Sequence, residues 1–144
     1  MRLALPQPFE DLDHTADVGV RVRGASAEEV LARLALALGA LLAGGGAVHA
    51  DAEERVAVAG GPGLAGTAVA LLRELLFRFA TARRIPAEIE IVRLGEDAVE
   101  ALVATGRYDP DVHGEGVDLK AVTWHAARLE REGDGWIGQV VFDI

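Results

Sequence analysis

Acidic residues and histidines gather in three places outside the expected helices, and their side chains can bind a metal ion or move a proton. The first place is the segment LDHTADVGVRV at residues 12–22. The second is the polar stretch DPDVHGEGVD at residues 109–118, and the third is the tail VVFDI at residues 140–144. Oxygen donors of this kind suit a hard cation such as Ca²⁺ or Mg²⁺.

The tail is unusual because Asp143 interrupts an apolar strand beside the carboxylate of Ile144. If the strand is ordered to its end, these two negative groups repel each other unless a cation or a basic group lies between them. The alternative is a frayed, solvated end, which is how most chain termini behave. The residues alone leave both interpretations open.

The segment DHTAD has two interpretations as well. Asp13 and Asp17 are either ligands or turn formers, because an aspartate accepts hydrogen bonds from nearby backbone N–H groups. His14 is either a ligand or a hydrogen-bonded structural histidine. Lys120 opens an apolar strand, and a solvent-facing strand lysine is the simple interpretation. His125 alternates with Thr123 on one strand face, so we expect a buried, hydrogen-bonded pair rather than a catalytic one.

The stretch at residues 109–118 looks superficially like an EF-hand loop, but it lacks the order of acidic residues and the final glutamate that such a loop needs. We expect a polar loop whose members are mostly solvated. Other catalytic templates fail as well. Ser26 is the only serine, there is no cysteine, and the glycine-rich GGPGLAG lacks the Lys-Ser/Thr of a phosphate loop.

Composition narrows the class of partner. The chain has 144 residues, of which 51% are hydrophobic and 26% charged, and its net charge is −9. One domain over residues 1–144 can hold a substantial core. With 14 Lys and Arg in total and no dense basic cluster, strong direct binding of nucleic acid is disfavoured. Neither a signal peptide nor a membrane span is evident, so we expect a cytoplasmic protein.

The elements that must position these residues follow from local patterns. Ser26 and Glu29 form a capping box at the start of a leucine-rich helix that the glycines at 44–46 end. A second helix is expected from about Leu64 to Ala82, and its broad apolar stripe predicts that it is the more buried of the two. Alternation or apolar character predicts strands at 9–13, 17–24, 54–60, 87–94, 98–108, 120–132 and 135–144.

The resulting order is β-β-α-β-α-β-β-β-β. It predicts a single α+β domain in which two helices pack on a mostly antiparallel β-sheet.

Three motifs together resemble the archease family over nearly the whole chain. They are LDHTADVGV near the start, GRYDPDVHGEGVDLKAVTWH in the second half, and VVFDI at the end. The sequence departs slightly at Leu119 and Trp124, where valine and tyrosine are common in the family. The resemblance implies a protein that is not itself an enzyme. Archeases activate the GTP- and metal-dependent RNA ligase of tRNA splicing and RNA repair, promoting its guanylylation and multiple turnover.

The resemblance also implies a site. Asp17, Asp143 and the carboxylate of Ile144 correspond to family metal ligands, with Ca²⁺ the usual metal and Mg²⁺ or Mn²⁺ as alternatives. Lys120 corresponds to a functional residue, which we expect to contact the ligase or its nucleotide phosphates. Asp13 and His14 would support the metal ligands through hydrogen bonds.

Two alternative functions remain. Some family members are described as chaperone-like modulators of a tRNA methyltransferase, and such a role would survive loss of the metal ligands. A metal-dependent hydrolase would turn over its own substrate without a partner. Activation of the ligase is the leading hypothesis.

Overall fold

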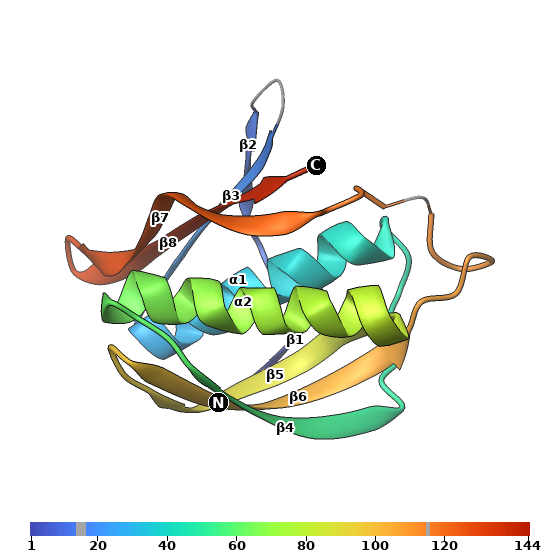
Figure 1. Ribbon diagram of the computed structural model, residues 1–144, viewed down its shortest axis with the longest axis horizontal. Helices are drawn as coiled ribbons and strands as arrows, with labels where there is room; N and C mark the ends of the chain where they lie inside the picture. The colour runs from blue at the N-terminus through green and yellow to red at the C-terminus, as the bar shows by residue number, and fades with distance from the viewer. Residues whose placement is uncertain (14–16, 115) are drawn as a thin grey trace.

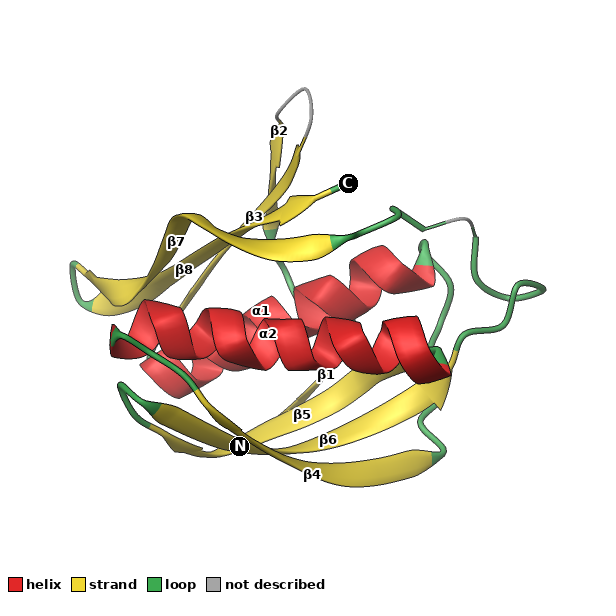
Figure 2. Cartoon of the chain, viewed as in Figure 1, coloured by secondary structure: helices red, strands yellow, loops and turns green. Residues whose placement is uncertain are grey.

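The computed structural model of this protein describes residues 1–13, 17–114 and 116–144. Two four-stranded sheets enclose a central layer of two helices, which gives three layers (Figures 1 and 2). The strand orders are β1-β5-β6-β4 and β2-β3-β8-β7, and all these pairs are antiparallel. In chain order the elements are β1 (Arg2–Ala4), β2 (Glu10–Asp13), β3 (Asp17–Gly24), α1 (Ala27–Ala43), β4 (Ala52–Ala59), α2 (Gly63–Ala82), β5 (Arg84–Leu94), β6 (Ala98–Arg107), β7 (Ala121–Glu132) and β8 (Gly135–Asp143).

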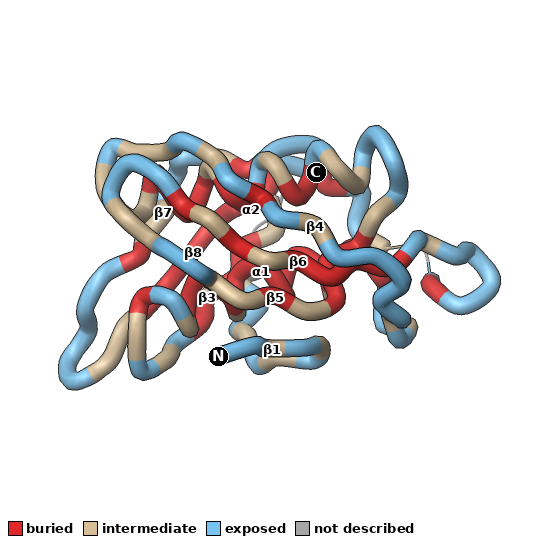
Figure 3. Tube along the Cα trace, turned by 90° about the horizontal axis from the view of Figure 1, so that it is seen from below, coloured by how far each residue is buried: buried red, intermediate tan, exposed pale blue. Residues whose placement is uncertain are grey.

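The predicted α+β class and the element order from β2 onward are confirmed. Strand β1 was not predicted, because three residues are too few to show alternation. It pairs with β5 at the rim of the molecule and is mostly exposed (Figure 3). The division of the strands into two sheets was not predicted either. Among the described residues, no helix is both long and apolar enough to cross a membrane.

Helix α1 has the predicted ends. The Ser26 hydroxyl accepts a hydrogen bond from the backbone N–H of Glu29 at 3.1 Å, which satisfies one of the free donors of the first turn. The carboxylate of Glu29 lies 3.1 Å from the guanidinium of Arg33 in an ion pair one turn along the helix. Gly44 ends the helix in the left-handed conformation, at φ 62°, where a side chain would be strained.

The prediction that the second helix is the more buried one is wrong. Helix α1 is the central element, because it packs on β5 of one sheet and on β3 and β8 of the other. Its leucines Leu31, Leu34, Leu36 and Leu38 are all completely buried. Helix α2 instead lies between the edge strands β7 and β4 and keeps one face in solvent (Figure 1). A broad apolar stripe did not distinguish these two environments.

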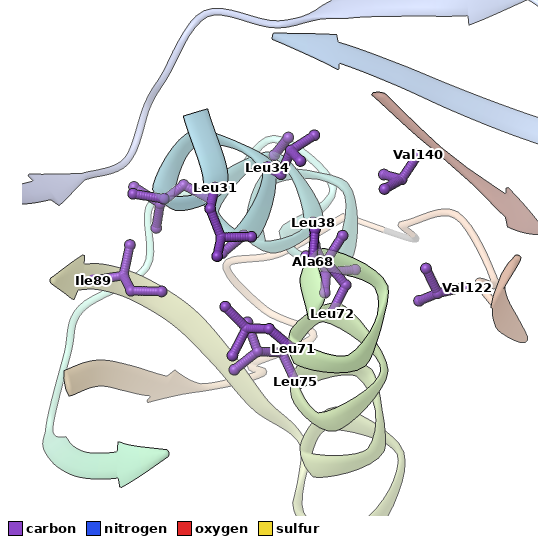
Figure 4. Packing of buried hydrophobic residues seen from close by; sticks show 14 of the residues in the cluster. Leu31, Leu34, Leu38, Ala68, Leu71, Leu72, Leu75, Ile89, Val122 and Val140 are labelled. Carbon is purple, nitrogen blue, oxygen red and sulfur yellow. The ribbon is translucent and has the colours of Figure 1, made fainter. Parts of the chain in front are cut away.

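The core lies between the two sheets and is filled mainly by the helices. Figure 4 shows Leu38 of α1 beside Ala68 and Leu72 of α2, with Ile89 on the side of one sheet and Val140 on the side of the other. Burying one such side chain contributes about 1.5–3 kcal/mol before the conformational entropy cost. This packing holds the sheet that carries β3, β7 and β8 rigidly over the helices.

Candidate functional site

The strand register brings Asp17 and Asp143 together. Asp17 is the first residue of β3 and Asp143 the last of β8, and the two lie directly opposite each other in the antiparallel pair. Side chains of such a pair leave the same face of a sheet, with Cβ atoms about 4.5–5.5 Å apart. Two of the three acidic places in the sequence therefore meet at one end of this sheet.

The two aspartates lie on the outer face of the sheet. The next residues inward, Val18 and Phe142, pair with each other, and Phe142 is completely buried on the side of the helices. Because side chains alternate along a strand, Asp17 and Asp143 point to the opposite, solvent side. Asp143 is exposed and Asp17 is half-buried.

Lys120 lies at the same end of the sheet. Its backbone N–H donates a hydrogen bond of 2.8 Å to the carbonyl oxygen of Asp143, and the next residue, Ala121, pairs with Asp143 in the β7–β8 register. The residue is exposed. Asp17, Lys120 and Asp143 come from motifs that are far apart in sequence, and they lie together where β3 and β7 begin and β8 ends (Figure 1).

The donor set fits a hard divalent cation only in part. Within the part of the chain that the structure describes, neither Asp17 nor Asp143 forms an ion pair, and no three His, Asp or Glu side chains gather to hold a metal. Two facing carboxylates supply oxygen donors of the right kind. Their repulsion favours a bound cation, but Ca²⁺ needs six to eight donors, so further oxygens must complete the shell.

The remaining residues of the first acidic segment are placed only in part. Asp13 is the last residue of β2 and pairs with Val18, which makes it a neighbour of the Asp17 end of β3. His14 and Thr15 lie outside the described residues, so the proposed supporting role of His14 stays a prediction. Glu115 of the polar loop lies outside them as well.

His113 has a structural role that the sequence left open. Residues 109–114 and 116–118 lie in the expected loop, but His113 is only 4% exposed and not solvated. Its Nδ1 accepts a hydrogen bond from the backbone N–H of Asp109 at 2.8 Å, and its Nε2 lies 2.8 Å from the carbonyl oxygen of Ala47. Since a carbonyl can only accept, Nε2 carries the proton. The ring therefore fastens the loop to the segment after α1.

The prediction of a buried pair of His125 and Thr123 is wrong. Thr123 is half-buried and donates a hydrogen bond to the carbonyl oxygen of Val141 at 3.1 Å, but His125 is exposed. The β7–β8 register shifts between Thr123 and Arg128, so simple alternation does not hold between them. No pattern in the sequence marks this shift.

Comparisons with known proteins agree on one family. The sequence model of the archease protein family matches residues 9–144. The archease of Methanosarcina mazei is 31% identical over 140 residues, which cover 94% of this chain and 95% of that protein. The archease of Methanopyrus kandleri is also 31% identical over 140 residues, covering 95% of this chain and 99% of that protein.

Two solved structures have the same fold. The solution structure of a protein from Methanobacterium thermoautotrophicum is 26% identical with a TM-score of 0.67, and the match covers 94% of this chain and 98% of that one. The crystal structure of a Thermotoga maritima archease, described as a possible chaperone, is 22% identical with a TM-score of 0.61. That match covers 97% of this chain and 98% of the other, and at this identity it bears on the fold alone.

Proposed function

Because this chain belongs to the archease family, we propose that it activates a GTP- and metal-dependent RNA ligase of tRNA splicing and RNA repair. That ligase joins a 2′,3′-cyclic-phosphate or 3′-phosphate end to a 5′-hydroxyl through a histidine-linked guanylate. The chain would promote guanylylation and allow multiple turnover, and it would not catalyse a reaction of its own.

One observation carries the proposal: Asp17 and Asp143 face each other at the end of the β3–β8 pair. We assign them as ligands of a divalent cation, Ca²⁺ first and Mg²⁺ or Mn²⁺ as alternatives, with the carboxylate of Ile144 as a third donor. When bound, the cation would turn an acidic end of the sheet into a positive centre able to attract phosphate oxygens. The two strands hold both carboxylates on one face before the metal arrives, which lowers the cost of ordering them.

Lys120 is assigned to the contact with the ligase or with its nucleotide phosphates. It is exposed, forms no ion pair with another described residue, and is tied to the site through the backbone of Asp143. The net charge of −9 supports docking at a basic cleft, which is what an RNA ligase needs to hold its substrate.

The test is a metal-binding measurement joined to a ligase assay. Calorimetric titration with Ca²⁺ and then Mn²⁺ should show binding by the wild type, and at least a tenfold weaker affinity for Asp17→Asn and Asp143→Asn. The same variants, shown to be folded by circular dichroism, should fail to stimulate guanylylation and multiple turnover. Asp134→Asn, which removes an exposed carboxylate in the β7–β8 turn, should behave as wild type in both assays.

Two results would argue against the metal-site proposal. If the wild type stimulates the ligase and both Asp variants do so equally, the aspartates serve the fold and the contact lies elsewhere. If the wild type binds neither cation, the metal assignment fails whatever the ligase assay shows.

The second candidate is a chaperone-like modulator of an RNA-modifying enzyme such as a tRNA methyltransferase. Membership of the archease family is what favours it, because some archeases are described as chaperone-like modulators of a tRNA methyltransferase. This role predicts protection of a partner enzyme from aggregation that Asp17→Asn and Asp143→Asn do not weaken. A wild type without effect on its host's ligase, together with such protection, would put this function first.

A further inference from the structure

Strand β7 carries a large irregularity that no part of the candidate site explains. Thr123 pairs with Val141 and Arg128 with Gln139, so four residues of β7 lie against one residue of β8. As a result Trp124, His125 and Ala126 are exposed one after another, where a regular strand would turn every second residue inward. Bulges of this kind redirect side chains and are enriched near functional sites.

Hydrogen bonds of the buried residue Gln139 hold the bulge in place. The side chain of Gln139, which is 7% exposed, donates from Nε2 to the carbonyl oxygen of Ala126 at 2.9 Å. Its Oε1 accepts from Arg21 Nε at 3.0 Å and from Arg21 Nη2 at 2.8 Å. Ala126 has φ 56°, a left-handed conformation that costs energy for alanine. The hydrogen bond from the buried amide of Gln139 maintains the bulge despite this backbone strain, so the bulge is a built feature of the strand.

Trp124 is fixed from the other side by helix α2. The Cη2 end of its ring lies so close to Gly66 that a Cβ there would approach it to 2.7 Å. The Arg73 guanidinium lies 5.9 Å from the centre of the ring, and Arg73 Nε donates to the carbonyl oxygen of Val122 at 3.0 Å. The indole is nevertheless 47% exposed. A large aromatic side chain is therefore held rigid and presented to solvent.

Arg73 adds a directed positive charge. Most arginines of this acidic chain form ion pairs, but Arg73 forms none with the residues that the structure describes. Its two Nη groups donate to none of those residues either, so they can form two parallel hydrogen bonds to one carboxylate. Phe77, one helical turn further along α2, is 60% exposed and extends the apolar area.

We propose that Trp124, His125, Arg73 and Phe77, here called the bulge surface, dock a segment of the partner ligase that carries a carboxylate beside an apolar side chain. This inference rests on the proposed function. Trp and Arg are the residue types that dominate the energetics of protein–protein interfaces. RNA is a poorer fit, because the net charge of −9 repels its phosphates, and it equally opposes a second copy of this chain.

The bulge surface lies within reach of the candidate site. Lys120 directly precedes β7 and is four residues from Trp124, which is about 13 Å in an extended chain. A standard interface of roughly 800 Å² on each partner is wide enough to include two residues this far apart. One docked ligase would thus bind through the bulge surface and be activated at the aspartates. Mutations in the bulge surface should therefore weaken the affinity for the ligase without lowering the maximal activation.

The experiment measures the affinity of the full chain for its ligase by calorimetry, together with the concentration that gives half-maximal activation. Trp124→Ala and Arg73→Gln should weaken binding at least tenfold and raise that concentration equally, while the maximal rate at saturation stays unchanged. Arg131→Gln is the matched control, because Arg131 stacks on Trp136 at 5.8 Å and also forms no ion pair with the described residues. It should stay within twofold of wild type.

The outcomes separate this inference from the proposed function. If the wild type activates the ligase while Trp124→Ala and Arg73→Gln keep wild-type affinity, the bulge surface is not the docking site and the proposed function stands. If the wild type does not activate at all, the proposed function itself fails. Should Trp124→Ala lose its fold, Trp124→Phe and Arg73→Gln decide the question, with tenfold weaker binding by Arg73→Gln supporting the docking site.

Two further measurements address other occupants of the surface. Self-association of the wild type that Trp124→Ala abolishes, seen by sedimentation equilibrium, would assign the surface to a second copy and overturn the inference. Binding of a labelled single-stranded RNA that Arg73→Gln abolishes would assign it to RNA and overturn it as well.

Discussion

Replacing Gly39 by alanine tests the packing of α1 on β5, because two physical effects on this substitution have opposite signs. Gly39 lies inside α1 and is buried. Alanine is a better helix former than glycine, which alone would stabilise the fold by about 1 kcal/mol. The methyl carbon, however, would lie about 1 Å closer to the carbonyl oxygen of Pro86 than van der Waals contact allows.

The steric effect should win. Pro86 belongs to β5 and is paired with Thr105 of β6, so its carbonyl cannot swing aside as the end of a side chain could. Relief requires α1 to move away from β5, which is the strand it packs on most extensively. Overpacking of this kind costs about 1–3 kcal/mol. The gain of about 1 kcal/mol in helix propensity offsets part of this cost, so we expect a net loss of up to about 2 kcal/mol in the free energy of unfolding.

Urea unfolding followed by far-ultraviolet circular dichroism measures this loss. The midpoint concentration for Gly39→Ala should fall with the slope unchanged, because the surface exposed on unfolding stays the same. Ala80→Gly, at an exposed position of α2, calibrates the propensity effect and should cost about 1 kcal/mol. A midpoint for Gly39→Ala above that of the wild type would refute the reasoning, since it would mean that α1 moves freely enough to accept the methyl group.

Two other predictions follow from single contacts. His113→Ala should lower the free energy of unfolding by about 1–3 kcal/mol, because the N–H of Asp109 and the carbonyl oxygen of Ala47 each lose a hydrogen-bond partner. Urea unfolding measures this loss, with His49→Ala at an exposed position as the control. Equal losses in the two variants would contradict the prediction. The hydrogen bond and ion pair with Arg84 lower the pKa of Asp51, so this pair stabilises the fold above the ordinary carboxyl pKa of about 3.9, and the contribution disappears as pH falls through the lowered value. In Arg84→Gln the pKa of Asp51 should rise toward that ordinary value, and an unchanged NMR titration midpoint of its carboxyl carbon would exclude the pairing.

Local signals determined where many elements begin and end. The alternation from Asp17 to Gly24 predicted β3 at both ends. The Ser26 cap and the left-handed Gly44 did the same for α1. Each signal depends on hydrogen bonds or backbone angles within a few residues, so sequence neighbours suffice to predict it. Strand β1 escaped because a three-residue strand is defined by its partner β5 and not by its own pattern.

The candidate site depended on information beyond local patterns. Residue chemistry named Asp17 and Asp143 as two separate places, each with a structural alternative, and only the resemblance to archeases joined them. The β3–β8 register places them opposite each other, and this register depends on the pairing of two strands that are far apart in sequence. Register is fixed by which faces are buried, and that is settled when both sheets close on α1.

Tertiary structure alone decided the surroundings of the histidines. His113 is buried because Asp109 and the segment after α1 close on it, although its loop is largely polar in sequence. His125 is exposed because β7 contains a bulge that Gln139, distant in sequence, holds by a hydrogen bond. The sequence determines the alternation of inward and outward side chains along a strand. The partner strand decides where a bulge interrupts this alternation, because the hydrogen bonds that stabilise the bulge come from elsewhere in the chain.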